Sequence, residues 1–136
     1  MKNLATALYA KIAGSAFSTS IGGRLYQARA PQGVTWPYAV FYIIHDRPDN
    51  TFQENLEDAL VQFSLFSKAP ETTEIEDIVT NLKALYDNCL LAITGNTHIM
   101  MNRQGANLTS VPADTEAGTG EYWQYDVDFE VIMQRN

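Results

Sequence analysis

The chain closes with the stretch WQYDVDFEVIM at residues 123–133, which decides the fold. Apolar and polar residues alternate along it, and a period of two is typical of a β-strand with one buried and one wet face. Asp126, Asp128 and Glu130 share the wet face. The pattern therefore predicts a sheet that is covered on one side and open to water on the other.

Two elements upstream give this strand its partners. Residues 57–67 alternate in the same way and predict a second strand with one wet face. Residues 73–90 repeat apolar side chains at steps of three and four, which predicts an amphipathic helix, and Thr73 with Glu76 forms a capping-box pattern at its start. Cys89 falls on the apolar stripe of this helix and is interpreted as a buried structural thiol.

The remaining segments predict one further helix and two further strands. Residues 2–13 predict a first amphipathic helix that ends at Gly14. Residues 36–44 are apolar at odd and even positions alike, which predicts a strand covered on both faces, and residues 46–50 carry turn chemistry. Residues 98–111 predict a less regular strand with a bulge at its glycine.

The element order is helix, short arm, two strands, helix, two strands. Short connections favour antiparallel neighbours, and strands grouped around helices favour the α+β class. We expect an antiparallel sheet of about four strands with two helices packed on one face. A length of 136 residues fits a single domain over residues 1–136.

Composition narrows the classes of function. Lys and Arg number 9 against 16 Asp and Glu, a net charge of −7, which argues against a protein that grips nucleic acid by neutralising phosphates. The single cysteine excludes an intrachain disulfide, and no zinc-finger spacing occurs. Lys11 interrupts the apolar stretch near the start, so we expect no signal peptide. No run of 18 uncharged apolar residues occurs, so we expect no membrane-spanning helix.

No catalytic, cofactor or metal site is expected. The chain has no nucleophile elbow, zinc-protease, dinucleotide or P-loop motif. His45, Asp46 and Asp49 could serve a small metal-dependent hydrolase, but a solvated turn explains the same residues. The acidic triplet of the last strand has three interpretations: a solvated face, a Ca²⁺ or acid–base site, or a strip that keeps DNA from adhering.

Aromatic residues exceed what one small core needs. We interpret some of them as anchors of a subunit interface, although others complete the core. The residues concerned are Phe17, Trp36, Tyr38, Tyr42, Phe52 and Tyr122.

A longer pattern carries a family resemblance. It consists of the N-terminal helix, Ile21-Gly22-Gly23-Arg24-Leu25-Tyr26, Arg29-Ala30-Pro31-Gln32-Gly33, Trp36-Pro37-Tyr38-Ala39-Val40-Phe41 and the closing strand. In this arrangement the chain resembles the tail terminator, or tail-completion (head-tail joining), proteins of long-tailed bacteriophages, prophages and gene transfer agents. The resemblance includes no catalytic motif.

The resemblance implies a structural virion protein made in the host cytoplasm. Its copies would form a ring, typically a homo-hexamer, on the head-proximal end of the tail tube, stop tube polymerisation and meet the head connector. DNA would pass through without sequence recognition, and Asp126, Asp128 and Glu130 become candidates for the lumen. For subunit contacts we select residues that combine area with directed hydrogen bonds or aromatic surface: Arg24, Tyr26, Arg29, Trp36 and Tyr122.

Two further alternatives stay open beside the hydrolase. A head-tail connector or neck completion protein would have similar features. A monomeric binding module that adds a partner's strand to an exposed sheet edge would show a stable monomer and a long unpaired edge.

Overall fold

The computed structural model describes residues 2–29, 33, 35–50, 55–68, 71–87, 91, 93, 96–111 and 121–135. Side chains are described for these except at residues 2, 3, 46–50, 55, 96–100, 111 and 135. Within these ranges the chain forms three helices and five strands. In chain order they are α1 (Lys2–Ile12), α2 (Ala16–Ser20), β1 (Leu25–Gln27), β2 (Tyr38–Asn50), β3 (Asn55–Ser67), α3 (Thr73–Tyr86), β4 (Asn96–Val111) and β5 (Tyr122–Arg135).

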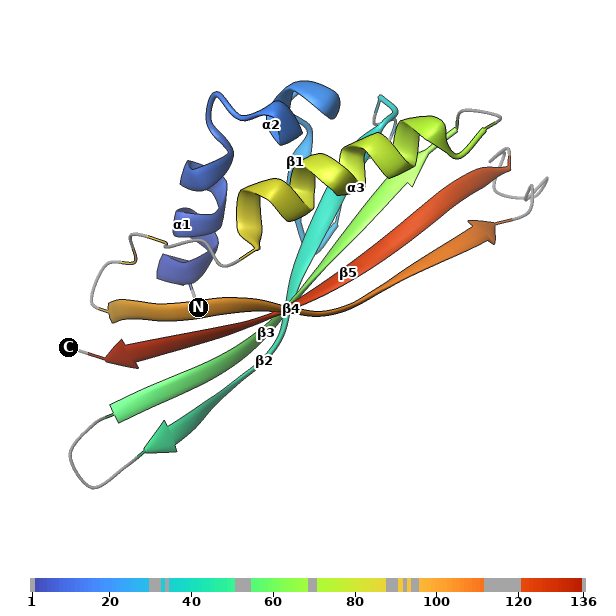
Figure 1. Ribbon diagram of the computed structural model, residues 1–136. Helices are drawn as coiled ribbons and strands as arrows, with labels where there is room; N and C mark the ends of the chain where they lie inside the picture. Colours follow the sequence, from blue (N-terminus) through green and yellow to red (C-terminus); the bar gives the residue numbers. More distant parts are fainter. Residues whose placement is uncertain are drawn as a thin grey trace.

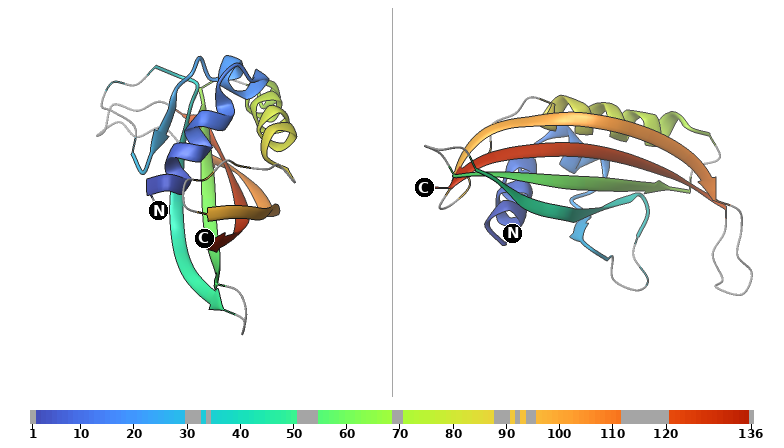
Figure 2. Two further views of the ribbon diagram at one scale, coloured as in Figure 1. Left: turned by 90° about the vertical axis from the view of Figure 1, so that its left-hand side faces the viewer. Right: turned by 90° about the horizontal axis from the view of Figure 1, so that it is seen from below.

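Over the described residues, the strands form one sheet in the order β1-β2-β3-β5-β4. The short β1 runs parallel to β2, and all the other neighbours are antiparallel. Figure 1 and Figure 2 show the helices gathered on one side of this twisted sheet. The α+β prediction is confirmed; the described chain adds the five-residue helix α2, and the expected arm contributes β1 as a fifth strand.

The core lies between the helices and the inner face of the sheet. Phe63 of β3 is its centre: its ring stacks on Tyr86 of α3 at 4.9 Å and meets Phe129 of β5 edge-on at 5.7 Å. All three side chains are fully buried. The predicted periods of β3, β5 and α3 are confirmed, because each strand sends alternate residues into this core and α3 sends every third or fourth.

The N-terminal corner is closed by local signals. In α1 the residues Leu4, Leu8 and Ile12 form one buried stripe, as predicted, and Gly14 follows at φ +73°. That conformation suits glycine and ends the helix. The hydroxyl oxygen of Ser15 then accepts a hydrogen bond from the N–H of Ser18 at 3.1 Å and caps α2.

The predicted turn at residues 46–50 is wrong, because these residues continue β2 to Asn50 and pair with β3. The turn residues are tolerated because β1 covers β2 only at residues 39–41. Pro48 thus lies on a strand with a free outer side among the described residues, where a missing N–H need break no ladder.

Three finer predictions also need correction. The strand at residues 36–44 is not covered on both faces, since Tyr42 and Ile44 are 40% and 50% exposed. The helix predicted to residue 90 ends at Tyr86, and Cys89 lies outside the described residues. Its N-cap is Thr72 in a helical conformation without a side-chain cap, so the predicted capping box does not form. The bulge predicted at the glycine of residues 98–111 is confirmed between Arg103 and Gly105.

Among the described helices, none is long and apolar enough to cross a membrane.

Candidate interaction surfaces

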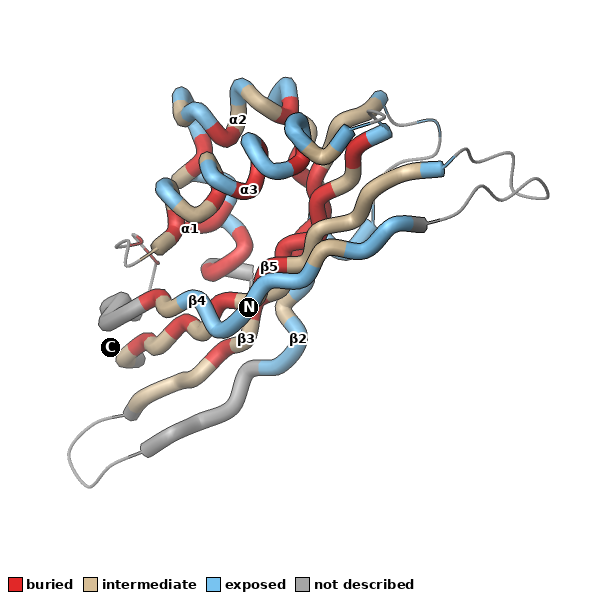
Figure 3. The backbone as a smooth tube through the Cα atoms, turned by 45° about the vertical axis from the view of Figure 1, so that its right-hand side comes forward, coloured by how far each residue is buried: buried red, intermediate tan, exposed pale blue. Residues whose placement is uncertain are grey.

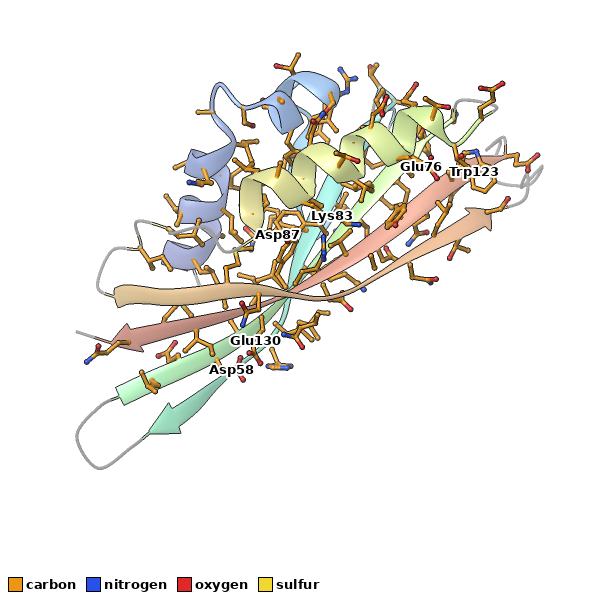
Figure 4. All side chains as sticks on the ribbon, in the orientation of Figure 1. Asp58, Glu76, Lys83, Asp87, Trp123 and Glu130 are labelled. Carbon is orange, nitrogen blue, oxygen red and sulfur yellow. The ribbon has the colours of Figure 1, made fainter. Side chains whose placement is uncertain are left out.

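Three acidic side chains of β5 lie together on the sheet face that the helices leave uncovered. Val127 and Phe129 between them are fully buried against the helices, and successive strand residues point to opposite faces. Asp126, Asp128 and Glu130 are each partly exposed. Figure 4 shows Glu130 on the side of the sheet away from α3. We call this set the acidic strip.

One end of the acidic strip is held by hydrogen bonds. The buried hydroxyl of Ser64 donates to Oδ1 of Asp126 at 2.7 Å, across the β3–β5 pair. Nε2 of Gln124 donates to the same oxygen at 3.1 Å. The Asp126 carboxylate is therefore fixed in orientation and partly compensated by two donors.

The middle of the acidic strip lacks such support. Oδ1 of Asp128 is buried and has no hydrogen-bond partner among the described residues. Asp58 of β3 lies diagonally across from Glu130, whose register partner is Leu60, and Figure 4 shows the two side chains next to each other. Asp58 thus extends the negative charge to a second strand. Its place on the wet face was visible in the alternation of residues 57–67, but its position beside the strip depends on the β3–β5 register.

An aromatic cluster lies at the end of the sheet where β5 begins. Trp36 is its centre, with ring centroids 4.9 Å from Tyr38, 5.1 Å from Tyr122 and 6.1 Å from Phe66. Tyr26 of β1 adds to its edge, 6.5 Å from Tyr38. The structure therefore brings together three of the five predicted interface residues, Tyr26, Trp36 and Tyr122. Each ring of the cluster is only partly buried.

Two members of the aromatic cluster were missed in the sequence. Phe66 stacks on Tyr38 at 4.8 Å, and Nζ of Lys68 lies 4.7 Å from the centre of the Trp36 ring. Phe66 stands at a wet-face position of an alternating strand, which is the signal that could have found it. Burial raises the pKa of Tyr38, and the neighbouring Tyr122 and Tyr42 raise it further.

The other predicted aromatics behave differently. Phe17 is fully buried between α2 and α3, where its ring meets Tyr86 at 6.4 Å, so it belongs to the core. Tyr42 is exposed on β2. Phe52 lies outside the described residues.

The two predicted interface arginines have different surroundings. Nε of Arg24 donates to the carbonyl oxygen of Pro37 at 2.9 Å, so this side chain ties the turn before β1 to the start of β2. Gly22 in that turn has φ +60°, a left-handed conformation that favours glycine, and a Cβ there would lie 2.6 Å from Nη1 of Arg24. Arg29 follows β1 and is exposed.

The alternative hydrolase residues lie on β2. His45 is exposed and pairs in register with Leu60, while the side chains of Asp46 and Asp49 lie outside the described set. Within the described residues, no three His, Cys, Asp or Glu side chains are grouped to hold a metal ion. His98 lies in β4, and its side chain is likewise not described.

A shallow polar hollow of about 360 Å³ lies beside the end of α3. Its lining includes Asp87 and Arg103, whose carboxylate and guanidinium are 3.1 Å apart and join α3 to β4. The lining that the structure describes includes none of the residues predicted for interfaces or the lumen.

Comparisons with known proteins agree with this architecture. The chain is similar to a chain in a solved structure described as the virion of a native gene transfer agent (GTA) particle, with a TM-score of 0.80. The likeness covers 95% of this chain and 92% of that chain at 12% identity, so it establishes the fold alone. No curated protein sequence matches the chain.

The family model described as tail completion protein gp17 matches residues 6–134, which include every helix and strand except the first four residues of α1 and the last residue of β5. This match confirms the resemblance to tail-completion proteins and gives the chain a structural role in phage tails. The chain belongs to the tail completion protein gp17 family.

Proposed function

We propose that this protein forms a ring, a homo-hexamer by the family resemblance, that caps the head-proximal end of the phage tail tube. The ring ends tube polymerisation and joins the tail to the head connector. The observation that carries the proposal is the uncovered sheet face with its acidic strip. A face that is bare of helices and negative at its centre suits a channel wall.

The charge of the acidic strip suits passage of DNA. Duplex DNA carries about one negative charge per 1.7 Å of axis, so a lumen lined with carboxylates repels the backbone. Repulsion keeps phosphates from adhering to the wall. The net charge of −7 for the whole chain has the same sign.

The aromatic cluster supports the assembly. Partly exposed Tyr and Trp side chains give large contact areas at low entropic cost, and such residues anchor protein interfaces. We assign Tyr26, Trp36 and Tyr122 to contacts between subunits, with Arg29 at the rim. Arg24 acts there indirectly, by holding the turn that carries Tyr26.

A capping assay tests the proposal. Purified tail tube protein is polymerised with and without this protein, and tube lengths and ends are measured by electron microscopy. We expect shorter tubes with a ring on one end only. Unaltered tubes together with tight binding to the purified connector would instead identify a neck completion protein.

A matched pair of variants tests the lumen assignment. Asp126→Asn/Asp128→Asn/Glu130→Gln neutralises the strip, and Glu71→Gln/Glu76→Gln/Asp77→Asn removes the same charge from exposed positions at and near the start of α3. We expect both to cap tubes, but only the first to slow DNA ejection and lower infectivity. Equal infectivity of the two variants would contradict the lumen assignment.

A further inference from the structure

Within the part of the chain that the structure describes, the two edges of the sheet have stretches without a strand partner. β4 forms one edge, and on the other edge β1 covers β2 only at residues 39–41. Figure 3 shows exposed stretches along both outer strands, where β3 and β5 are mostly buried or intermediate. Unpaired strand edges are where further strands are added.

Hydrogen bonds to β1 reveal which backbone groups of β2 point outward. The N–H of Ala39 donates to the carbonyl of Arg24 at 2.9 Å, and the carbonyl of Phe41 accepts from the N–H of Ala28 at 2.8 Å. The backbone N–H and C=O groups of Ala39 and Phe41 therefore point outward, away from β3. Inward and outward residues alternate in antiparallel ladders, so the odd-numbered residues of β3 opposite them bond to β5.

The unbroken register of β3 carries this alternation to the far end of β2. Ala59 and Glu57 also have odd numbers, and their partners on β2 are Asp46 and Pro48. The backbone N–H and C=O positions of these two residues consequently point outward, away from β3. Because proline has no N–H, the outer edge of β2 loses a donor at Pro48. The pairing segment of β2 is thus residues 42–47, between the part that β1 covers and Pro48.

The same alternation applies to β4. The backbone groups of the odd-numbered β5 residues form hydrogen bonds with β3. The backbone N–H and C=O groups of their β4 partners, Ala106, Leu108 and Ser110, therefore point outward, away from β5. Residues 106–110 contain neither a charge nor a proline, and all except Leu108 are exposed. This pairing segment of β4 therefore carries none of the charges or prolines that protect many edges against strand addition.

The two outer strands are also bent at the same level. β2 has a register shift between Ile43 and His45, and β4 has one between Arg103 and Gly105. One row crosses the sheet there, from Ile43 through Val61 and Phe129 to Arg103. Bulges increase local twist and curl a sheet, so both edges curve at this level. Across the sheet, Ala106 and Leu108 are level with Phe41 and Ala39, which β1 covers. Pairing with residues 42–47 of another subunit therefore requires strands inclined to the ring axis, so that adjacent subunits are staggered along them.

We propose that residues 106–110 of β4 in one subunit pair with residues 42–47 of β2 in the next subunit. β2, β3, β5 and β4 alternate in direction, so β4 runs opposite to β2. A rotation about a ring axis preserves strand direction along that axis, and the seam is therefore antiparallel like the neighbouring ladders. The contact is head-to-tail and leaves a free edge at each end until the ring closes. It rests on the proposed ring and adds which edges meet.

Proline variants of the full chain test this seam. Ala106→Pro/Ser110→Pro removes two outward N–H groups and leaves the inward ladder to β5 intact. Ala106→Ser/Ser110→Ala is the control, because it keeps both N–H groups while losing the Ser110 hydroxyl that donates to Glu121. We expect the control to form rings like the wild type, by sedimentation and negative-stain imaging. The proline variant should keep its circular dichroism spectrum and need at least tenfold higher concentration to assemble.

Mixing distinguishes a head-to-tail seam from pairing of two β4 edges. A proline subunit still offers β2, so it should bind a growing arc and block it, and an equimolar mixture should form less than half the wild-type yield of rings. A proline variant that assembles normally, or one that leaves wild-type assembly unaffected in the mixture, overturns the seam while the ring stands. Wild-type protein that stays monomeric, alone and on purified tubes, overturns the ring as well.

If the double variant misfolds, Ser110→Pro alone gives the same comparison, because this position lies one residue from the end of the strand.

Discussion

Asp126 and Asp128 should respond oppositely to removal, although they share a strand face and a charge. Asp126 accepts hydrogen bonds from the buried Ser64 and from Gln124, at 2.7 and 3.1 Å to the same oxygen. A hydrogen bond to a charged group contributes about 1.5–3 kcal/mol. Asp126→Ala removes both hydrogen bonds, and partial exposure of the strip limits the loss. The variant should lower the free energy of unfolding by about 2 kcal/mol, which corresponds to a fall of roughly 8 °C in Tm.

Asp128 has a buried oxygen without a partner among the described residues, so its carboxylate gains little in the folded state. Asp128→Ala removes a desolvated charge between two like charges, and we expect unfolding free energy unchanged or higher by up to about 1 kcal/mol. Urea denaturation followed by the fluorescence of Trp36 and Trp123 measures both. The Ser64→Ala/Asp126→Ala cycle should show a coupling of about 1 kcal/mol. Equal destabilisation by the two alanine variants, or no coupling to Ser64, would refute this reasoning.

Three other changes have defined outcomes. Tyr86→Phe removes the buried hydroxyl that donates to the Leu8 carbonyl at 2.8 Å and should cost about 1 kcal/mol in urea denaturation; a loss close to zero would mean that water replaces it. Phe63→Ala leaves a cavity at the core centre and should cost about 3–5 kcal/mol, so a mild effect on the urea midpoint would contradict the packing. The raised pKa of Tyr38 means that the unfolded chain releases this proton first, so stability is retained below about pH 10 and falls above it. Tyr38→Phe should have a smaller drop in Tm between pH 9 and pH 11, and an identical drop would exclude this tyrosine as a contributor.

The parts of the fold that could be predicted from sequence depend on short-range periodicity. The alternation of residues 123–133 and the three-and-four spacing of α3 both report which side of an element meets the core. Their burial in the structure follows directly, as Phe129 and Tyr86 illustrate. The acidic strip was predictable for the same reason, since residues two apart on a strand share a face.

The failures depend on contacts between distant residues. Residues 46–50 have turn chemistry, and only the pairing of β2 with β3 shows that Pro48 occupies an outward position where its missing N–H is harmless. Arg24 was selected for a contact between subunits, and its side chain donates a hydrogen bond to the carbonyl of Pro37, 13 residues later. The aromatic cluster joins side chains from four strands and the segment before β2, and no local pattern contains that information.

The two faces of the sheet are under different constraints, one from the core and one from water. This difference accounts for a fold that the chain shares with the gene transfer agent protein at 12% identity and a TM-score of 0.80. A core accepts many combinations of apolar side chains if volume and pattern are kept, so positions such as Val127 and Phe129 constrain the class of residue more than its identity. The uncovered face carries no such constraint. Asp128 is costly there, because its buried oxygen has no hydrogen-bond partner within the described part of the chain, and a chain selected for stability alone would replace it. The proposed lumen supplies a reason for its presence, because a carboxylate there would repel DNA phosphates.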